Sequence, residues 1–381
     1  MPWGDYSLEF AWFEDPPDPT SWVEAGERCF TASFARGRDS QLDQINPLSG
    51  SFLMNNSARH FSFDYALGPY YGYLLPKRVG RMRCTYREVQ YDLARFMVSE
   101  ITPDDRYDVQ QATIKIFDAQ TWLEQIAATH TYTDLTTGEL IAEALDEAGW
   151  PADLRQLDAG QLAGINVTYT DVPIWSGHIL KGLESERGIA FIGRDGAVVY
   201  QDRHHRYKGA HLTPQAVFVD GMRDFRPSLS YREIANDVVV TYAGGGTVQR
   251  IDASSQDAYG PMRLPVTAEL LGLGDATSLA EWLLDRRKDP HSKPPRLLIT
   301  NGTEAKYQAL LDLEISDRVR VTDSRSGIAT VDFYIEGIQH DIDFRQHTHQ
   351  AEYTLTLCDV DRYLLIGVPG YAEFGSGKFG Y

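Results

Sequence analysis

Three short strand-like segments recur in the same order in two distant parts of the chain, and this internal repeat is the feature that most limits the possible folds. Segments 77–87, 96–101 and 113–119 (KRVGRMRCTYR, FMVSEI, TIKIFDA) match 317–325, 333–338 and 354–360 (DRVRVTDSR, FYIEGI, TLTLCDV). Self-similarity of this kind indicates duplicated modules. We therefore expect two similar β-barrels per chain. Such chains build rings, since a trimer presents six similar modules.

The remaining segments predict a helical region and an insertion between the two copies. From Cys29 to Phe117 short alternating stretches separated by turn residues are typical of strands. Asp118 caps a helix that we expect to continue through AQTWLEQIAAT. A capping box formed by Thr136 and Glu139 then opens a second helix. The hairpin NDVVVTYAGGGTVQRIDAS follows, and we expect it to begin the second barrel.

The predicted fold class is therefore a β-rich α+β multidomain protein, with two similar β-barrel domains, a helix-containing middle domain and a small inserted domain. The predicted domains are 1–117 (first β-barrel), 118–228 (mixed α/β middle domain), 229–255 with 314–366 (second β-barrel), 256–313 (small inserted α/β domain) and 367–381 (C-terminal extension).

Composition excludes several classes of function. The 381 residues are 43% hydrophobic and 24% charged, and no run approaches the roughly 18 apolar residues that a membrane span needs. The acidic N-terminus lacks a secretory leader, so we expect synthesis in a cytoplasm. Cys29, Cys84 and Cys358 are widely separated, as buried reduced thiols are. A net charge of −18 argues against a nucleic-acid grip, which requires clustered Lys and Arg.

A histidine-rich stretch, YIEGIQHDIDFRQHTHQAEYTLTLC at 334–358, is the most site-like part of the chain. Alternation along its two strands separates the aspartates from the imidazoles, and a turn near 345–348 would set His340 roughly opposite Tyr353. Zinc requires three or four converging ligands, whereas only His340 with His347 or His349 faces one side. The matching stretch at 97–117 has no histidine. We interpret the stretch as a structural hairpin and predict no metal site.

Other candidate sites are weaker. DRHHRYKGAH at 202–211 is basic, but its adjacent histidines point to opposite faces of a strand, so a solvated loop is favoured over a phosphate site. FGSGKFG at 374–380 lacks the spacing and the following helix of a phosphate-binding loop. No arrangement supplies a nucleophile or a base. We predict that the protein is not an enzyme and has no cofactor.

The order of motifs resembles the tail hub proteins of tailed bacteriophages, also called baseplate hub or minor tail proteins, which have relatives in contractile injection systems. GRDSQLDQINPLSGSFLMNN at 37–56 is similar to their G-R-…-L-x-N opening, and YLLPKRVGRMR at 73–83 to their L-x-P-G-R-x-V-R-I segment. FDAQTWL looks like the entry to their helical domain. DAYGPMRL, ATSLAEWLLDRR and FYIEGIQHDI resemble later motifs, the last being G-I-x-H-x-I. Lys77 departs from the family, which often has glycine there.

The resemblance implies a structural protein of the virion tail tip, made in the cytoplasm of a bacterial host. It implies a homotrimer whose six barrels form a ring joining the six-fold tail tube to a three-fold tip. The implied partners are distal tail and tail tube proteins, the tape-measure protein, and tip or fibre proteins. DNA would pass through the channel without specific binding.

Two rival functions remain open. The first is a distal tail or receptor-binding protein with affinity for carbohydrate, which the 12% aromatic content favours. The second is a wall-degrading enzyme, which would need a carboxylate or metal cluster. For the hub, we predict that the aromatic extension orders against a neighbouring subunit or partner through Tyr371, Phe374, Phe379 and Tyr381.

Overall fold

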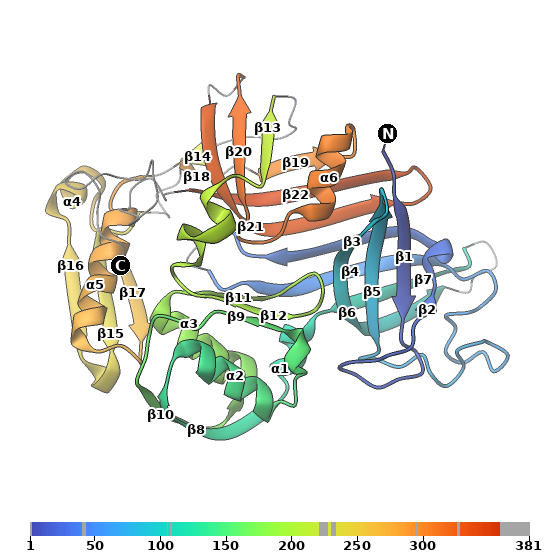
Figure 1. The fold of residues 1–381 in the computed structure, drawn as a ribbon, viewed down its shortest axis with the longest axis horizontal. Coiled ribbons are helices and arrows are strands. Elements are labelled where there is room, and N and C mark those ends of the chain that lie inside the picture. The colour runs from blue at the N-terminus through green and yellow to red at the C-terminus, as the bar shows by residue number, and fades with distance from the viewer. Residues whose placement is uncertain are drawn as a thin grey trace.

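The computed structural model describes residues 2–39, 43–104, 106, 109–220, 228–229, 234–290, 292–293, 296–325 and 328–358. Strands supply most of the regular structure, which confirms the β-rich α+β class (Figure 1).

The strands are β1 (Asp5–Phe10), β2 (Val23–Glu24), β3 (Cys29–Gly37), β4 (Asn46–Asn55), β5 (Val79–Tyr86), β6 (Val89–Asp104), β7 (Gln111–Phe117), β8 (Ala127–Leu135), β9 (Arg155–Leu157), β10 (Ile165–Pro173), β11 (Ile189–Ile192), β12 (Val198–Gln201), β13 (Ala216–Val219), β14 (Ser228–Leu229), β15 (Asp237–Tyr242), β16 (Thr247–Ile251), β17 (Arg263–Ala268), β18 (Ser292–Lys293), β19 (Arg296–Thr300), β20 (Arg318–Asp323), β21 (Ile328–Asp343) and β22 (Thr348–Leu357). The α-helices are α1 (Ala119–Leu123), α2 (Thr137–Glu147), α3 (Leu180–Glu186), α4 (Ala253–Tyr259), α5 (Leu273–Arg287) and α6 (Glu304–Asp312).

One 12-stranded sheet contains the strands of both sequence repeats. Its main path runs β13-β20-β21-β3-β4-β7-β6-β5-β1-β2, while β22 pairs with β21 and β19 pairs with β22. The pairing of β21 with β3 joins the two halves. Among the described strands neither half closes on itself, so the two separate barrels that we predicted are not found in the strand pairing. The reason is that the C-terminal half of β21 pairs with β3, which belongs to the other half of the sheet.

The internal repeat is visible in the backbone of this sheet. The first copy is the antiparallel meander β5-β6-β7, and the second is β20-β21-β22. The long central strand of each copy carries a register shift at the same point, between Val98 and Glu100 in β6 and between Ile335 and Gly337 in β21. A bulge bends a strand and is a specific feature rather than a propensity of β-sequences. The shared bulge therefore supports the duplication.

The third sequence match, of 113–119 with 354–360, is displaced by two residues in the structure. Val98 pairs with Ile116, and its counterpart Ile335 pairs with Leu355. Ile116 therefore corresponds to Leu355, whereas the sequence match placed it on Leu357. The alternation of a strand repeats every two residues, so a shift by two keeps the same face and leaves no trace in the pattern.

Each copy begins with a left-handed turn, at Lys77 in the first copy and at Ser316 in the second. The first sequence match, which set Lys77 on Asp317, is therefore displaced by one residue in the structure. Lys77 has φ of 67° and Ser316 has φ of 82°, and both amide groups donate to the central strand, to the carbonyls of Val98 and Ile335. The left-handed region favours glycine. The positive φ explains why glycine is often found at the position of Lys77 in the family that the motifs resemble. The lysine adopts the same turn at a cost in backbone conformational energy.

The middle region follows its predicted capping signals. Asp118 caps α1 by accepting from the amide of Gln120, and the Thr136–Glu139 capping box of α2 is present. The helix α1 ends at Leu123, earlier than predicted, because the chain from Ala127 onward forms β8, which pairs with β10. None of the described helices is long and apolar enough to cross a membrane.

The hairpin of β15 and β16 lies in a different sheet from the one that we predicted. It pairs with β17 in a separate three-stranded sheet, which packs against the middle region in one apolar core and lies apart from the main sheet in Figure 1. By contrast β19, which we assigned to the insertion, pairs with β22 in the main sheet. Both segments have the alternation of a strand, and alternation does not specify the partner strand.

Replacing Lys77 by glycine tests the left-handed turn. We expect the free energy of unfolding to rise by up to about 1 kcal/mol, because glycine adopts positive φ without steric cost. Thr85→Gly, an exposed position within β5, is the control and should be destabilising. Denaturant unfolding measures both variants, and a loss of stability in Lys77→Gly equal to that of the control would contradict the assignment.

Candidate functional site

The joint between the two halves of the main sheet is the most specialised part of the molecule, and we call it the seam. Here β3 and β21 run antiparallel, with Gly37 opposite Gly337. Gly37 has φ of 117°, and a Cβ atom there would lie 2.2 Å from the Cα of Gly337. Only glycine satisfies both conditions. The backbones of the two repeats therefore approach more closely here than side chains would allow.

A buried carboxylate sits directly beside this contact. Glu336 is the bulged residue of β21 and is fully buried. Its Oε2 atom accepts from Arg38 Nε at 2.7 Å, and its Oε1 atom accepts from Arg206 Nη1 at 2.5 Å and from Thr356 Oγ1 at 2.7 Å. Burial opposes its ionisation, but Arg206 and Arg38 outweigh burial and lower the pKa of Glu336 to about 2. The carboxylate is therefore charged and bridges two guanidinium groups.

This ion cluster connects three parts of the chain. Arg38 follows β3 in the first half of the main sheet, Glu336 belongs to the second repeat, and Arg206 comes from the segment after β12. Two residues before Arg38, Arg36 donates to the carbonyl of Ile192 at 2.9 Å and forms an ion pair with Glu314 at 2.7 Å. The end of β3 thus fixes the middle region and the second repeat together.

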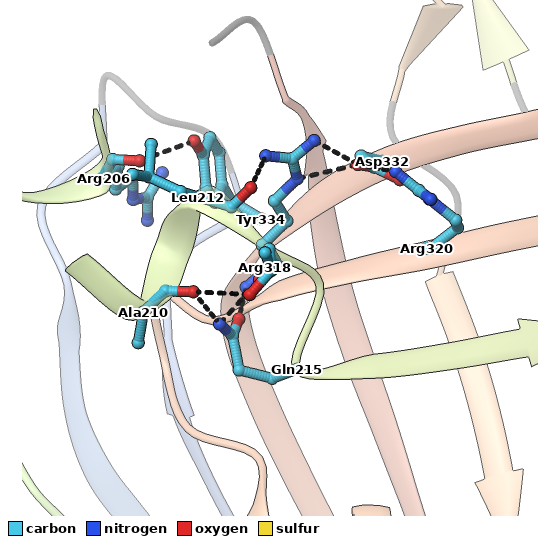
Figure 2. Close-up of polar contacts among 9 residues, drawn as sticks. Arg206, Ala210, Leu212, Gln215, Arg318, Arg320, Asp332 and Tyr334 are labelled. Carbon is cyan, nitrogen blue, oxygen red and sulfur yellow. Dashed lines mark hydrogen bonds and ion pairs between the residues drawn. The ribbon is translucent and has the colours of Figure 1, made fainter. Parts of the chain in front are cut away.

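A second set of polar contacts fastens the segment 205–219 to the second repeat (Figure 2). Arg318 on β20 donates to the carbonyl of Leu212 at 2.9 Å and pairs with Asp332 on β21, which also binds Arg320. The Arg318 amide donates to Gln215 Oε1 at 2.6 Å, and Tyr334 donates to the carbonyl of Arg206 at 3.0 Å. These contacts hold Arg206 where it meets Glu336.

A cavity of about 340 Å³ lies beside the ion cluster, where the seam, the middle region and the pair β17 and α5 meet. Its lining includes Arg38, Arg206 and Tyr334 from the seam, Leu183 from α3 and Trp282 from α5. Because all three regions line this cavity, the seam lies where they contact one another.

The histidine-rich hairpin is a buried structural element. His340 lies opposite Ala351, and Tyr353 lies opposite Ile338, so the predicted pairing of His340 with Tyr353 was wrong by two residues. The turn begins after Asp343, earlier than predicted, and this moves the register. The buried rings of His340 and His349 share a hydrogen bond of 2.9 Å, and His349 Nδ1 lies 2.8 Å from the hydroxyl of Tyr6 on β1.

The hydrogen-bonded chain extends through Tyr6. The hydroxyl of Tyr307 on α6 donates to that of Tyr6 at 2.9 Å, and the amide of Gly4 donates to Tyr307 at 2.8 Å. Burial lowers the pKa of His349 to about 3 and holds that of His340 well below its usual value. The two imidazoles are therefore neutral, and they tie β1 and α6 to the second repeat.

The remaining predicted site residues are placed as follows. His347 lies exposed at the turn and stacks on Trp3, with ring centroids 5.0 Å apart. In the segment 202–211, His205 binds Asp158 at 2.8 Å. Within the described residues no group of three or more His, Cys, Asp or Glu side chains is arranged to hold a metal ion. The predicted interface residues Tyr371, Phe374, Phe379 and Tyr381 lie outside the described residues.

Comparison with solved structures identifies the fold. No family profile matches the chain, and no curated protein matches its sequence. The 43 kDa tail protein of prophage MuSo2 from Shewanella oneidensis is similar over 94% of this chain and 98% of its own, with 12% identity and a TM-score of 0.60. A tail protein from Neisseria meningitidis covers 92% and 96%, with 13% identity and a TM-score of 0.62. The chain has the phage tail protein fold.

A component of the type VI secretion system from E. coli, described as structurally similar to bacteriophage T4 tail proteins, matches over 92% of this chain and 77% of its own, with 10% identity and a TM-score of 0.52. The resemblance drawn from the short motifs is thus confirmed at the level of fold, over nearly the whole chain.

The seam explains two of the motifs that carry this resemblance. The G-R pair is Gly37 and Arg38, and the G-I-x-H-x-I segment begins at Gly337. The structure brings the two glycines opposite each other and sets Arg38 on Glu336. Sequence reasoning missed this because the motifs lie about 300 positions apart. Two signals were available in the sequence, the pair Gly37-Arg38 at the end of one strand and the pair Glu336-Gly337 within the other.

Replacing Glu336 by glutamine tests the ion cluster. Loss of the carboxylate leaves Arg38 and Arg206 buried without a counter-charge, and we expect the free energy of unfolding to fall by about 3–5 kcal/mol. Glu304→Gln removes the carboxylate of an exposed ion pair with Arg87 and should change stability little. Equal effects of the two variants in denaturant unfolding would show that the cluster does not hold the seam.

The buried imidazoles make stability depend on pH. The folded pKa of His349 lies below its unfolded value near 6.5, so the unfolded state binds more protons below pH 6.5 and stability is lost as the pH falls. Between pH 7 and pH 5 this histidine alone should lower the free energy of unfolding by about 2 kcal/mol. We expect His349→Asn to lose this part of the pH dependence. His347→Asn is the control because it removes an exposed imidazole of the same hairpin, and equal pH slopes for His349→Asn and the unaltered protein would contradict the assignment.

Proposed function

We propose that this chain is a structural hub protein of a phage tail tip or baseplate. In this proposal three copies form a ring in which six similar β-modules, two from each chain, adapt the six-fold tail tube to a three-fold tip. The ring surrounds the channel through which the genome passes. The hub performs no catalysis and uses no cofactor.

The observation that carries the proposal is the duplicated meander within one sheet. Both copies have the same strand order, the same bulge and the same left-handed entry residue. Two similar modules in each of three subunits give a ring with approximate six-fold symmetry. The fold comparison supports the same assignment, because the two tail proteins are matched along almost their whole length.

The proposed partners follow from this position in the virion. Distal tail or tail tube proteins would contact the six-fold face, and tip or fibre proteins the three-fold face. The tape-measure protein would occupy the channel before infection. A charge of −18 per chain, tripled in the ring, would repel DNA and let it pass without specific binding. The aromatic extension at 367–381 would order against a neighbouring subunit or partner.

A second candidate function is favoured by one observation. Large apolar side chains are exposed on the loop before β5 and beside it, at Phe13, Phe63, Leu67, Tyr71, Tyr73 and Leu75. Exposed aromatic rings of this kind also bind sugars. We therefore keep a distal tail or receptor-binding protein with affinity for carbohydrate as the alternative.

Electron microscopy of the purified protein in negative stain separates these functions. The hub predicts trimeric rings with a central channel and no binding to host-surface polysaccharide. A monomer that binds polysaccharide would favour the receptor-binding alternative. A monomer with a cleft that degrades peptidoglycan would overturn both.

A further inference from the structure

Among the described residues, one edge of the main sheet is unpaired in the first repeat at the position where it is paired in the second. In β6, residues 89–97 pair with β5, and Val98 exchanges hydrogen bonds with Lys77 and Arg78 just before it. Beyond this point, residues 99–104 pair with β7 on their other side. No described residue forms a backbone hydrogen bond with the β5-side edge of 99–104.

The second repeat shows what occupies the equivalent edge. There β21 pairs first with β20, and after its bulge the same edge pairs with β3 from Gly337 to Asp343. As a result Gly337 and Ile338 are buried, whereas their counterpart Glu100 is exposed and Ile101 is half-buried. Of the two equivalent edges, only that of β21 pairs with β3.

The direction of the backbone groups on the open edge follows from a proline. Pro103 pairs with Ala112 in the ladder between β6 and β7. Proline has no N–H, and it is tolerated within a strand where its nitrogen faces an unpaired edge. Alternate residues of a strand face the same edge. The N–H of Ile101 therefore points to the open edge, and Pro103 limits how far a further strand can pair.

Exposed apolar side chains lie on the loop that leads to the start of this edge, where Lys77 bonds Val98. The loop that leads into Lys77 carries Leu67 at 83% exposure and Leu75 at 45%. The same loop is a series of tight turns. In each turn a backbone amide donates to the carbonyl three residues earlier, and the donors are Arg59, Ser62, Tyr65, Gly68 and Tyr71. An apolar surface on an ordered loop is typical of a protein interface.

We infer that the edge of β6 from Ser99 to Pro103 is a docking site for an edge strand from the second half of the main sheet in a neighbouring copy of this chain. The occupant is a second copy because, within one chain, β3 from the other half of the main sheet fills the equivalent edge. The inference rests on the proposed trimeric ring and names the strand edge through which its subunits join. Each contact between subunits then repeats the strand pairing of β21 with β3, although Ser99 and Glu100 stand where the seam has Glu336 and Gly337.

Proline substitution at the edge tests this inference. Ile101→Pro removes the N–H that faces the open edge and leaves the ladder with β7 unchanged, while Ile101→Ala removes the same side chain and keeps the N–H. Thr102→Pro is a second control, because its N–H faces β7 and its loss should lower the melting temperature. The oligomeric state of the full-length chain is measured by analytical ultracentrifugation over a concentration series.

We expect Ile101→Pro to reduce the trimeric fraction at least about tenfold, with a melting temperature close to that of Ile101→Ala. Ile101→Ala should remain trimeric. A trimeric Ile101→Pro variant would overturn the docking site and leave the proposed ring intact. If the unaltered protein is monomeric at every concentration, both the proposed ring and the docking site are contradicted.

Discussion

The fold depends on one buried carboxylate held between two guanidinium groups. Glu336 occurs where β21 leaves its own repeat and turns to β3, and Arg38 and Arg206 reach it from the first repeat and the middle region. A buried ion pair contributes little net stability over apolar packing, but a mispaired buried charge is very unfavourable. Such a cluster therefore favours one packing arrangement of the three chain segments over alternatives that would leave a buried charge unpaired. The register that opposes Gly37 and Gly337 places Arg38 on one oxygen of the carboxylate, and Arg206 binds the other.

The sequence predicted local structure well where a single residue determines it. Asp118 and the Thr136–Glu139 box start helices as expected. Order along the chain also identified the duplication and the family resemblance. These successes concern signals that are read within a few residues.

Strand partners were the part that could not be predicted. β15 and β19 are both short apolar strands, and each joined the sheet opposite to the one expected. The same limit displaced His340 from Tyr353 by two residues, which leaves every side chain on its predicted face. The seam could not be predicted for a related reason. Each of its residues contacts a partner about 300 positions away, and the sequence does not show which residues are paired.

The duplicated meander has a consequence for the geometry of assembly. The two repeats differ in most side chains, yet they keep the bulge and the left-handed turn that determine how the central strand bends. If contacts between subunits copy the contact within a subunit, the rotation between the two repeats of one chain also determines the curvature of the assembly. A rotation near one sixth of a turn closes a ring, and any other value leaves an open spiral. Ring size is then encoded in a single folded chain, in the two glycines and the carboxylate that fix the angle at the seam.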